Sequence, residues 1–360
     1  MQASRRSYAR ILPGSFALAC LFIALIGVLP AAAGTIKKFT VPTAGSSPNG
    51  ITTGPEGALW FTEAGSGKIG RVTTSGAITE LTLTGGSASG FGSHPITKGP
   101  DGALWFVEQS TGTIGRLTTT GVFSQFNLPG NINKDEVIES AKSITAGPDG
   151  ALWFTSQNKS PVTFTIVSGQ LGRITTSGSI TEFTLPSGGT RRTTPHPIDI
   201  TTGPDGALWF TDPNLSKIGR ITTSGSLTQF TSPQADPIGI TTGPDGASWF
   251  TATFFPAAKV GRVTTAGVFT IFTIASSADG VSAGESIATG PDGKLWFSDY
   301  DSTLSRGSIL SITTAGTVKA FPFPTLNVID GITAGPDAKM WFTSTNLSTN
   351  VGSVGNITTS

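Results

Sequence analysis

The sequence predicts an all-β fold, a seven-bladed β-propeller with four-stranded antiparallel blades. First, the motif Gly-Pro-Glu-Gly-Ala-Leu-Trp-Phe at residues 54–61 returns six more times in near-copies. Second, the tryptophans of these motifs are 40 to 56 residues apart, and a period in the mid-forties suits one four-stranded blade. Third, each repeat holds four short runs rich in β-branched and aromatic residues, separated by Gly and Pro.

The first repeat shows the expected strands in chain order. Residues 50–53 form the first strand, and the Gly-Pro-Glu-Gly sequence after it predicts a tight turn, because Pro presets φ and Gly closes the turn. Residues 58–62 form the second strand, whose two faces are both apolar, as in a sheet packed between two others. Residues 68–73 form the third strand, and a Thr-Thr-Ser-Gly turn leads into the fourth at 78–83.

The two ends of the chain predict how the ring closes. The seventh repeat stops at residues 358–360, just before its fourth strand. A sequence of the fourth-strand type stands instead at residues 34–42. We therefore expect the N-terminal strand to complete the last blade, which leaves the ring without an open sheet edge.

Residues 1–33 have the features of a signal peptide. A basic start is followed by an apolar run at residues 16–29 and by small residues suited to cleavage. The run is short for a membrane span. Arg5 and Arg6 are adjacent, which fits the twin-arginine export route as well as the general secretory route. We expect a periplasmic or extracellular protein.

We expect residues 34–360 to form one domain, and their composition argues against a nucleic-acid partner. The chain of 360 residues is 37% hydrophobic and 12% charged, so a packed core is expected. After residue 33 there are 20 basic and 22 acidic residues, which argues against a nucleic-acid partner, because phosphate binding needs a clustered positive field. The one cysteine, Cys20, lies in the signal peptide, so no disulfide is expected. We expect a monomer that does not contact the membrane after cleavage.

The loops divide between two faces of the predicted propeller. The Gly-Pro-Asp-Gly and Thr-Thr-Ser-Gly turns hardly vary between repeats, whereas the other two classes of loop vary in length and project together from the opposite face. We name this the loop-bearing face; its variable segments are residues 130–141, 156–170, 187–195 and 275–284. Variable loops on a rigid scaffold usually carry function. We expect this face to bind a small molecule, peptide or glycan.

The residues that recur in every repeat are interpreted as structural. We expect the seven tryptophans to pack between blades: Trp60, Trp105, Trp153, Trp209, Trp249, Trp296 and Trp341. An arginine recurs in the third strand of five repeats, at Arg71, Arg116, Arg173, Arg220 and Arg262. We expect it to bond carbonyls or the turn carboxylate, or to lie over a tryptophan ring, rather than to bind an anion.

The repeat resembles that of the virginiamycin B lyase, or streptogramin lyase, family. The resemblance rests on Ile-Thr-x-Gly-Pro-Asp-Gly-x-Leu-Trp-Phe-Thr followed by Lys-Ile-Gly-Arg-Ile-Thr-Thr-Ser-Gly-x-Ile-Thr-Glu-Phe, and it extends over residues 34–360. It implies an enzyme that opens a cyclic depsipeptide antibiotic by elimination across an ester bond. It also implies a divalent cation, usually Mg²⁺, with a histidine as general base and glutamates that hold the metal.

The residues that the resemblance implies for catalysis are not retained. Glu285 and Asp330 occupy the positions of two histidines. The positions of two glutamates and a tyrosine hold Val328, Ser344 or Thr345, and Asn49. Proton abstraction beside a carbonyl needs a base with a pKa near the working pH, which His supplies most readily. The resemblance therefore predicts the scaffold and does not by itself predict the activity.

Two rings of positions could still form a site on the loop-bearing face. The ring two residues before the first-strand Ile holds the candidate binding residues Asn49, His94, Lys142, Glu285 and Asp330, together with Ile198 and Ile238. The ring three residues after each Trp holds the candidate metal ligands Glu63, Glu108, Asp212 and Asp299.

These rings allow several hypotheses. His94 could be a relocated base, with a metal between Glu63 and Glu108, or it could be a solvated or loop-bonded side chain. The acidic ring could hold Mg²⁺ or Ca²⁺ structurally, or its carboxylates could be isolated and solvated. His196 is out of register with the ring and is expected in a loop.

Three functions therefore remain open from the sequence. The favoured one is an exported scaffold without catalytic activity that binds a ligand on its loop-bearing face. The others are a divergent lyase of the streptogramin-lyase type and a metal-dependent hydrolase or lactonase. Fold alone does not choose among them.

Overall fold

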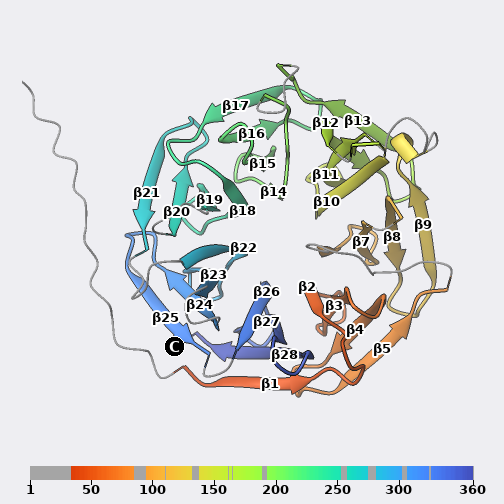
Figure 1. The fold of residues 1–360 in the computed structure, drawn as a ribbon, viewed down its shortest axis with the longest axis vertical. Helices are drawn as coiled ribbons and strands as arrows, with labels where there is room; N and C mark the ends of the chain where they lie inside the picture. Colours follow the sequence, from red (N-terminus) through yellow and green to blue (C-terminus); the bar gives the residue numbers. More distant parts are fainter. Residues whose placement is uncertain are drawn as a thin grey trace, which may run out of the picture.

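The computed structural model of the protein describes residues 34–84, 95–109, 111–131, 138–160, 162–163, 165–188, 193–252, 258–274, 281–301, 306–323 and 326–359. The predicted signal peptide and His94 lie outside these residues. Within them, seven four-stranded antiparallel sheets form a ring around a central axis (Figure 1). The predicted seven-bladed β-propeller is confirmed. Across the described ranges, no helix has the length and apolar character needed to cross a membrane.

The blades follow one another along the chain, and the first strand of each lies nearest the axis (Figure 1). Blade 1 contains β2 (Pro48–Thr53), β3 (Leu59–Glu63), β4 (Lys68–Val72) and β5 (Ile78–Thr82). Blade 2 contains β6 (Ile96–Lys98), β7 (Leu104–Glu108), β8 (Thr113–Leu117) and β9 (Phe123–Asn127), and is followed by the 3-10 helix η1 (Pro129–Asn131). Blade 3 contains β10 (Ile138–Ala146), β11 (Leu152–Lys159), β12 (Ile166–Ile174) and β13 (Ile180–Thr184).

The second half of the ring repeats this order. Blade 4 contains β14 (Ile200–Thr202), β15 (Leu208–Asp212), β16 (Lys217–Ile221) and β17 (Leu227–Thr231). Blade 5 contains β18 (Pro237–Thr242), β19 (Ser248–Ala252), β20 (Lys259–Val263) and β21 (Phe269–Thr273). Blade 6 contains β22 (Val281–Thr289), β23 (Leu295–Asp301), β24 (Arg306–Ile312) and β25 (Val318–Pro322). Blade 7 contains β26 (Asn327–Ala334), β27 (Lys339–Asn346), β28 (Val351–Thr358) and β1 (Ile36–Thr40).

Blade 7 confirms the predicted closure. The N-terminal strand β1 pairs antiparallel with β28, with Ile36 opposite Ile357 and Thr40 opposite Ser353. Phe39 stacks on Trp341 with ring centroids 5.8 Å apart. The first and last segments of the domain therefore share one sheet, and this pairing closes the ring.

The core consists of seven apolar clusters, one at each interface between blades. Each tryptophan packs against the second strand of the next blade, as Trp209 does against Phe250, and each is at most 1% exposed. In six blades a fourth-strand Phe stacks on the tryptophan, and Trp209 and Phe230 lie 5.7 Å apart. The predicted role of the tryptophans in packing between blades is confirmed.

The recurrent arginines bond the turn carboxylates, as expected. In blade 4, Asp205 accepts a hydrogen bond from the Trp209 indole N–H at 2.9 Å and another from Arg220 Nε at 2.5 Å. The same pair of bonds recurs at Glu56, Asp101 and Asp149. In these blades, one carboxylate therefore fixes the turn to the two middle strands.

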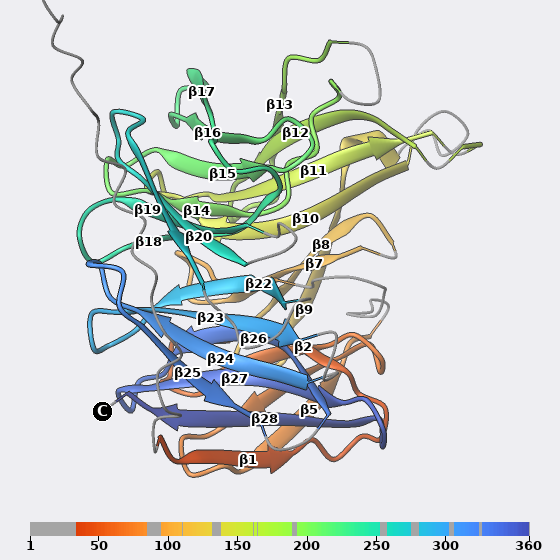
Figure 2. The ribbon, with the colours of Figure 1, turned by 60° about the vertical axis from the view of Figure 1, so that its left-hand side comes forward.

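Blade 3 departs from the predicted loop boundaries. Residues 156–170 were expected as a loop, but β11 continues to Lys159 and β12 begins at Ile166. The strand β10 likewise begins at Ile138, inside the predicted loop 130–141. The β11–β12 hairpin projects beyond the neighbouring blades (Figure 2). The additional residues of this blade therefore lengthen the strands β10, β11 and β12, which extend on the loop-bearing face.

Candidate functional site

The first strands carry irregularities at the end that faces the variable loops. Five of the seven first-to-second strand pairs shift register just before the first-strand Ile: β2, β10, β18, β22 and β26. A β-bulge leaves a residue unpaired and turns its side chain, which is why bulges are frequent near functional sites. Asn49, Lys142 and Asp330 lie at these bulges, so the bulges place them at the mouth of the central channel.

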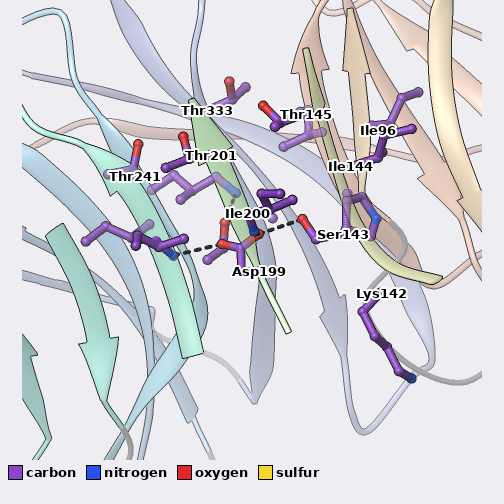
Figure 3. Close-up of a pocket in the computed structure, with 18 of the residues that line it drawn as sticks. Ile96, Lys142, Ser143, Ile144, Thr145, Asp199, Ile200, Thr201, Thr241 and Thr333 are labelled. Carbon is purple, nitrogen blue, oxygen red and sulfur yellow. Dashed lines mark hydrogen bonds between the residues drawn. The ribbon is translucent and has the colours of Figure 1, made fainter. Parts of the chain in front are cut away.

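A central cavity of about 300 Å³ lies on the propeller axis, and the first-strand segments of all seven blades line it. Asn49, Lys142 and Asp330 line its loop-bearing end and are half-buried. Thr145, Thr201, Thr241 and Thr333 lie at the other end from Lys142 (Figure 3). This volume is at the lower limit of common ligand pockets. The cavity offers one ammonium group, carboxylates, amides and hydroxyl groups to a ligand.

Asp199 joins three blades inside this cavity (Figure 3). Its Oδ1 accepts bonds from Ser143 Oγ at 2.6 Å and from its neighbour Ile200 N at 2.9 Å. Its Oδ2 accepts a bond from Ile240 N at 2.8 Å. The carboxylate is therefore fixed in place by blades 3, 4 and 5.

Asp199 is not among the site residues predicted from the sequence. The sequence does mark this residue, because the position just before the first-strand Ile holds a carboxylate in blade 4 alone. The matching positions of the other blades hold Gly50, Pro95, Ser143, Gly239, Ser286 and Gly331. Ser286 makes a similar link, because its hydroxyl oxygen accepts a bond from Ile332 N of blade 7 at 3.0 Å. The position is thus used to join neighbouring blades.

The structure brings together part of the predicted binding set. Asn49, Lys142 and Asp330 share the cavity. Glu285 belongs to the irregular part of β22 between Ala283 and Ile287, and its side chain lies outside the described residues. His94 lies outside them entirely. Their roles in binding stay predictions.

The four predicted metal ligands are in separate blades, and Glu63, Glu108 and Asp212 each accept hydrogen bonds from polar groups of nearby residues. Glu108 accepts bonds from Thr113 Oγ1 and Gln125 Nε2, both at 2.7 Å. Asp212 accepts bonds from the backbone N–H groups of His196 and Leu215. Glu63, Glu108, Asp212 and Asp299 are at most 7% exposed. Among the described residues, no three His, Cys, Asp or Glu side chains gather in a way that could hold a metal ion.

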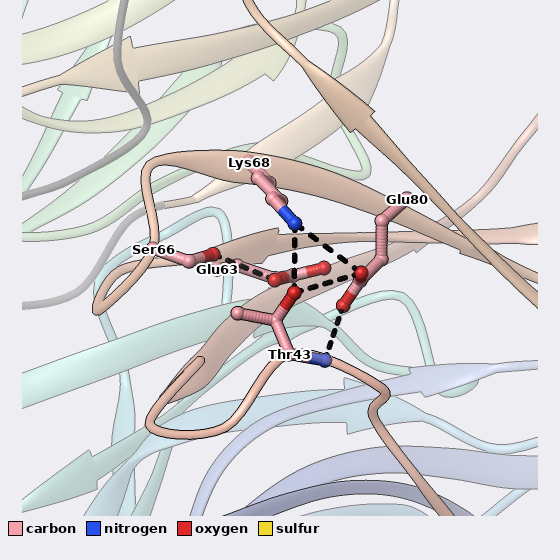
Figure 4. A network of polar contacts seen from close by, with 5 residues as sticks. All are labelled: Thr43, Glu63, Ser66, Lys68 and Glu80. Atoms are coloured by element: carbon pink, nitrogen blue, oxygen red, sulfur yellow. Dashed lines mark hydrogen bonds and ion pairs between the residues drawn. The ribbon is translucent and has the colours of Figure 1, made fainter.

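Glu63 belongs to a compact network in blade 1 (Figure 4). Its Oε2 accepts a bond from Ser66 Oγ at 2.7 Å. Nearby, Glu80 accepts bonds from the Thr43 N–H and hydroxyl at 2.9 and 2.8 Å, and Lys68 donates to Thr43 Oγ1 at 2.7 Å. Burial raises the pKa of Glu63 to about 7; Ser66 and Lys68 oppose this shift, and the charge of Glu80 adds to it. Glu63 is therefore a proton-binding group near neutral pH.

The comparisons with known proteins agree with the geometry. The family model for virginiamycin B lyases matches residues 24–199 and 141–360. The chain belongs to the virginiamycin B lyase family. A structure of streptogramin B lyase is 29% identical with a TM-score of 0.72, and the match covers 90% of this chain and 98% of that one. A catalytically inactive variant of virginiamycin B lyase from Staphylococcus aureus with quinupristin is 30% identical with a TM-score of 0.72, over 90% and 99% of the two chains.

More distant structures share the propeller fold alone. A putative gluconolactonase is 13% identical with a TM-score of 0.50, and the match covers 91% of this chain and 94% of that one. At this identity the likeness says nothing about chemistry.

Within the virginiamycin B lyase family, this chain has a changed set of groups at the cavity. Asp330 and Asn49 line the cavity at the positions where the family resemblance implied a histidine and a tyrosine. An Asp or Asn at these positions supplies hydrogen bonds and charge to a ligand.

Proposed function

We propose that the protein is an exported binding protein of the virginiamycin B lyase family, with a peptide-like small molecule as ligand. The observation that carries this proposal is the composition of the central cavity. Lys142, Asp330 and Asn49 line this cavity from three blades. Asp199 also lines it and is held in place by three hydrogen bonds. Both charges and several hydrogen-bonding groups complement the amides and termini of a peptide-like molecule.

Quinupristin, which accompanies the lyase variant of Staphylococcus aureus, is a suitable first probe. Isothermal titration calorimetry with residues 34–360 is expected to show saturable binding, and liquid chromatography with mass spectrometry to show intact quinupristin afterwards. Lys142→Met and Asp330→Asn are expected to weaken binding, whereas Lys98→Met, an exposed lysine of β6, is the matched control. Absence of binding by the folded protein would refute the proposal for this class of ligand.

The second candidate is a divergent lyase, and the match over 98–99% of two lyase chains favours it. In that case quinupristin incubated with the protein and Mg²⁺ would become a linear isomer of unchanged mass. His94→Ala would then abolish the conversion if His94 is the base. A thermal shift with Mg²⁺, Ca²⁺ and EDTA would test the predicted metal binding at the same time.

Export is part of the proposal and rests on residues 1–33. Expression in a bacterial host, followed by fractionation, is expected to place the protein outside the cytoplasm with Gly34 as its first residue. Replacing Arg5 and Arg6 by Lys would block export by the twin-arginine route and leave the general secretory route working. An unprocessed protein that stays in the cytoplasm would contradict the export proposal.

A further inference from the structure

The first strand of each blade is the inner edge of its sheet and lies nearest the axis (Figure 1). In blade 1, Gly54 N donates to Ala58 O at 2.7 Å, so these residues form a hydrogen-bonded pair of the β2–β3 ladder. Hydrogen-bonded and non-hydrogen-bonded pairs alternate in an antiparallel ladder. Ile51, three residues before Gly54 and opposite Phe61, therefore belongs to a non-hydrogen-bonded pair, and its N–H points away from β3 toward the axis.

The same register recurs in every blade. A glycine three residues after each first-strand isoleucine donates its N–H across the ladder in the same way. The isoleucines that share this position all line the central cavity: Ile51, Ile96, Ile144, Ile200, Ile240, Ile287 and Ile332. Their N–H groups therefore form a ring of backbone donors that face inward.

In three blades a side chain accepts the hydrogen bond from this N–H. Asp199 accepts from Ile200 N at 2.9 Å and from Ile240 N at 2.8 Å (Figure 3). Ser286 Oγ accepts from Ile332 N at 3.0 Å. Both acceptors line the cavity and stand just before the first-strand isoleucine, and each reaches the N–H of the following blade. These bonds confirm that the N–H groups face the cavity.

Blades 1, 2 and 3 lack this link from the preceding blade. The residues at the linking position before them have no side-chain acceptor: Gly331, Gly50 and Pro95. The N–H groups of Ile51, Ile96 and Ile144 therefore remain as donors on one side of the cavity, in three successive blades. A fourth, Ile287, follows Gly239 and is separated from these three by blade 7.

The three donors are held rigidly. The side chains of Ile51, Ile96 and Ile144 are at most 8% exposed, and each belongs to a different apolar cluster between blades. Packing fixes these side chains, and the strand ladders fix the backbone around them. A ligand that accepts bonds from such groups loses little free energy to the ordering of the protein.

The charges in the cavity favour a neutral acceptor. Asp199 and Asp330 line the same cavity as the three donors, and Lys142 is at its loop-bearing end. Two carboxylates oppose the entry of an anion, whereas the oxygen of an amide carbonyl accepts a hydrogen bond without bringing a net charge. An amide carbonyl is therefore the acceptor that suits these N–H groups.

We infer that the N–H groups of Ile51, Ile96 and Ile144 form a carbonyl subsite, which binds amide carbonyl oxygens of the ligand. This inference rests on the proposed function, because it places the carbonyl groups of a peptide-like molecule against blades 1, 2 and 3. Recognition at this subsite depends on the backbone of the ligand and not on its side chains.

The test follows the isoleucine amides by NMR. Protein of residues 34–360, isotope-labelled at isoleucine, is titrated with sarcosine anhydride, a neutral cyclic diamide with two carbonyl groups and no N–H. Dioxane, a neutral ring of the same size without a carbonyl group, is the matched compound. Sarcosine anhydride is expected to move the amide protons of Ile51, Ile96 and Ile144 downfield, and dioxane to leave them in place. Ile51→Val, Ile96→Val and Ile144→Val each remove one signal and so assign the spectrum.

Two isoleucines are controls within the same ring. Ile240 and Ile332 already donate to side chains, so their signals are expected to shift little. Absence of shifts at Ile51, Ile96 and Ile144, or equal shifts with dioxane, would overturn the inference. This comparison uses the natural sequence and needs no variant to fold.

A gain of response tests the same inference from the other side. Ser286→Ala removes the acceptor of Ile332 N, so the Ile332 signal is expected to begin to respond to sarcosine anhydride. Ser308→Ala, the same change in β24 and outside the residues that line the cavity, is the matched control. An Ile332 signal that stays unresponsive in the folded Ser286→Ala protein would count against the carbonyl subsite.

The two proposals fail separately. If quinupristin binds and the three isoleucine amides respond neither to it nor to sarcosine anhydride, the carbonyl subsite is wrong and the proposed function stands. If the amides respond to sarcosine anhydride and quinupristin does not bind, the subsite stands and the ligand class of the proposed function is wrong.

Discussion

Ala338 occupies the last position of the Gly-Pro-Asp-Gly turn of blade 7, where the other six blades have glycine. Its φ is +56°, close to the +70° to +77° of those glycines. A side chain with a Cβ is disfavoured in this left-handed region by about 1–2 kcal/mol. The seventh turn therefore carries local strain that the other six avoid.

Ala338→Gly is expected to stabilise the protein by about 1 kcal/mol, since the relief of strain exceeds the added entropy of glycine in the unfolded chain. Urea denaturation measures this change. Gly206→Ala is the matched control: a Cβ there meets no atom within 4 Å, so its expected loss of about 1 kcal/mol comes from the backbone alone. A less stable Ala338→Gly protein would contradict the argument.

The second residue-scale prediction concerns Glu63 and pH. Its folded pKa of about 7 lies above the usual value for glutamate, so the folded state binds more protons than the unfolded state between about pH 4 and 7. Stability gained from this group is present at low pH and is lost as pH rises through that window. The Glu63→Gln protein is expected to lose less stability than the natural protein as pH rises through this window. At pH 8 it is expected to be at least as stable as the natural protein.

Thermal melts of both proteins across this pH range measure the difference. Glu80 shares the network but its pKa is lowered, because bonds from Thr43 and Lys68 outweigh the effect of burial, so its contribution is lost instead in acid. Parallel pH profiles for Glu63→Gln and the natural protein would show that Glu63 does not titrate near neutrality.

At the scale of the elements, the turn carboxylate connects the first-to-second strand turn to the rest of its blade. Burial tends to raise the pKa of Asp205, but bonds from Trp209, Arg220 and the Ala207 N–H outweigh it and lower the pKa. Removing the carboxylate leaves the N–H of a fully buried indole without its acceptor. An unpaired buried donor is costly.

Asp205→Ala is therefore expected to destabilise the protein by about 2–3 kcal/mol, and Asp205→Asn by less, because the amide oxygen still accepts one bond. Because the folded pKa is lowered, this stabilisation is present above the usual aspartate pKa and is lost as pH falls through the folded value. Chemical denaturation at neutral and acidic pH measures both effects. Equal stability of Asp205→Ala and the natural protein would mean that the turn needs no carboxylate.

At the scale of the whole molecule, one noncovalent joint closes the ring. The strand β1 supplies the outer edge of blade 7 and brings Phe39 onto Trp341 and Val41 into the core. Without it, β28 would be an exposed edge ready to pair with another chain.

Removing residues 34–42 is expected to cost about 3 kcal/mol or more, because it removes the buried Val41, the half-buried Phe39 and the pairing with β28, and to produce oligomers. Thermal melts and size-exclusion chromatography with light scattering measure the two outcomes. The protein that begins at Gly34 is the control. A monomer of unchanged stability would show that the ring does not depend on this joint.

The sequence by itself determined the blade, its turns, the burial of the tryptophans, the bonding of the arginines and the closure by residues 34–42. These features depend on local turn chemistry and on strand periodicity, and the seven copies repeat the signal. Asn49, Lys142 and Asp330 could be predicted as neighbours for the same reason, because identical repeat positions return to the axis.

Only the tertiary structure decided what the loop-bearing face contains. Asp199 bonds Ser143 and Ile240, which are 56 and 41 residues away, and Pro197 O accepts a bond from Gln157, which is 40 residues away. The four carboxylates predicted as metal ligands are instead buried within separate blades: Glu63, Glu108, Asp212 and Asp299. Repeat register places a residue along its own strand, but partners across blades and the depth of burial depend on insertions and side-chain packing that differ from one blade to the next.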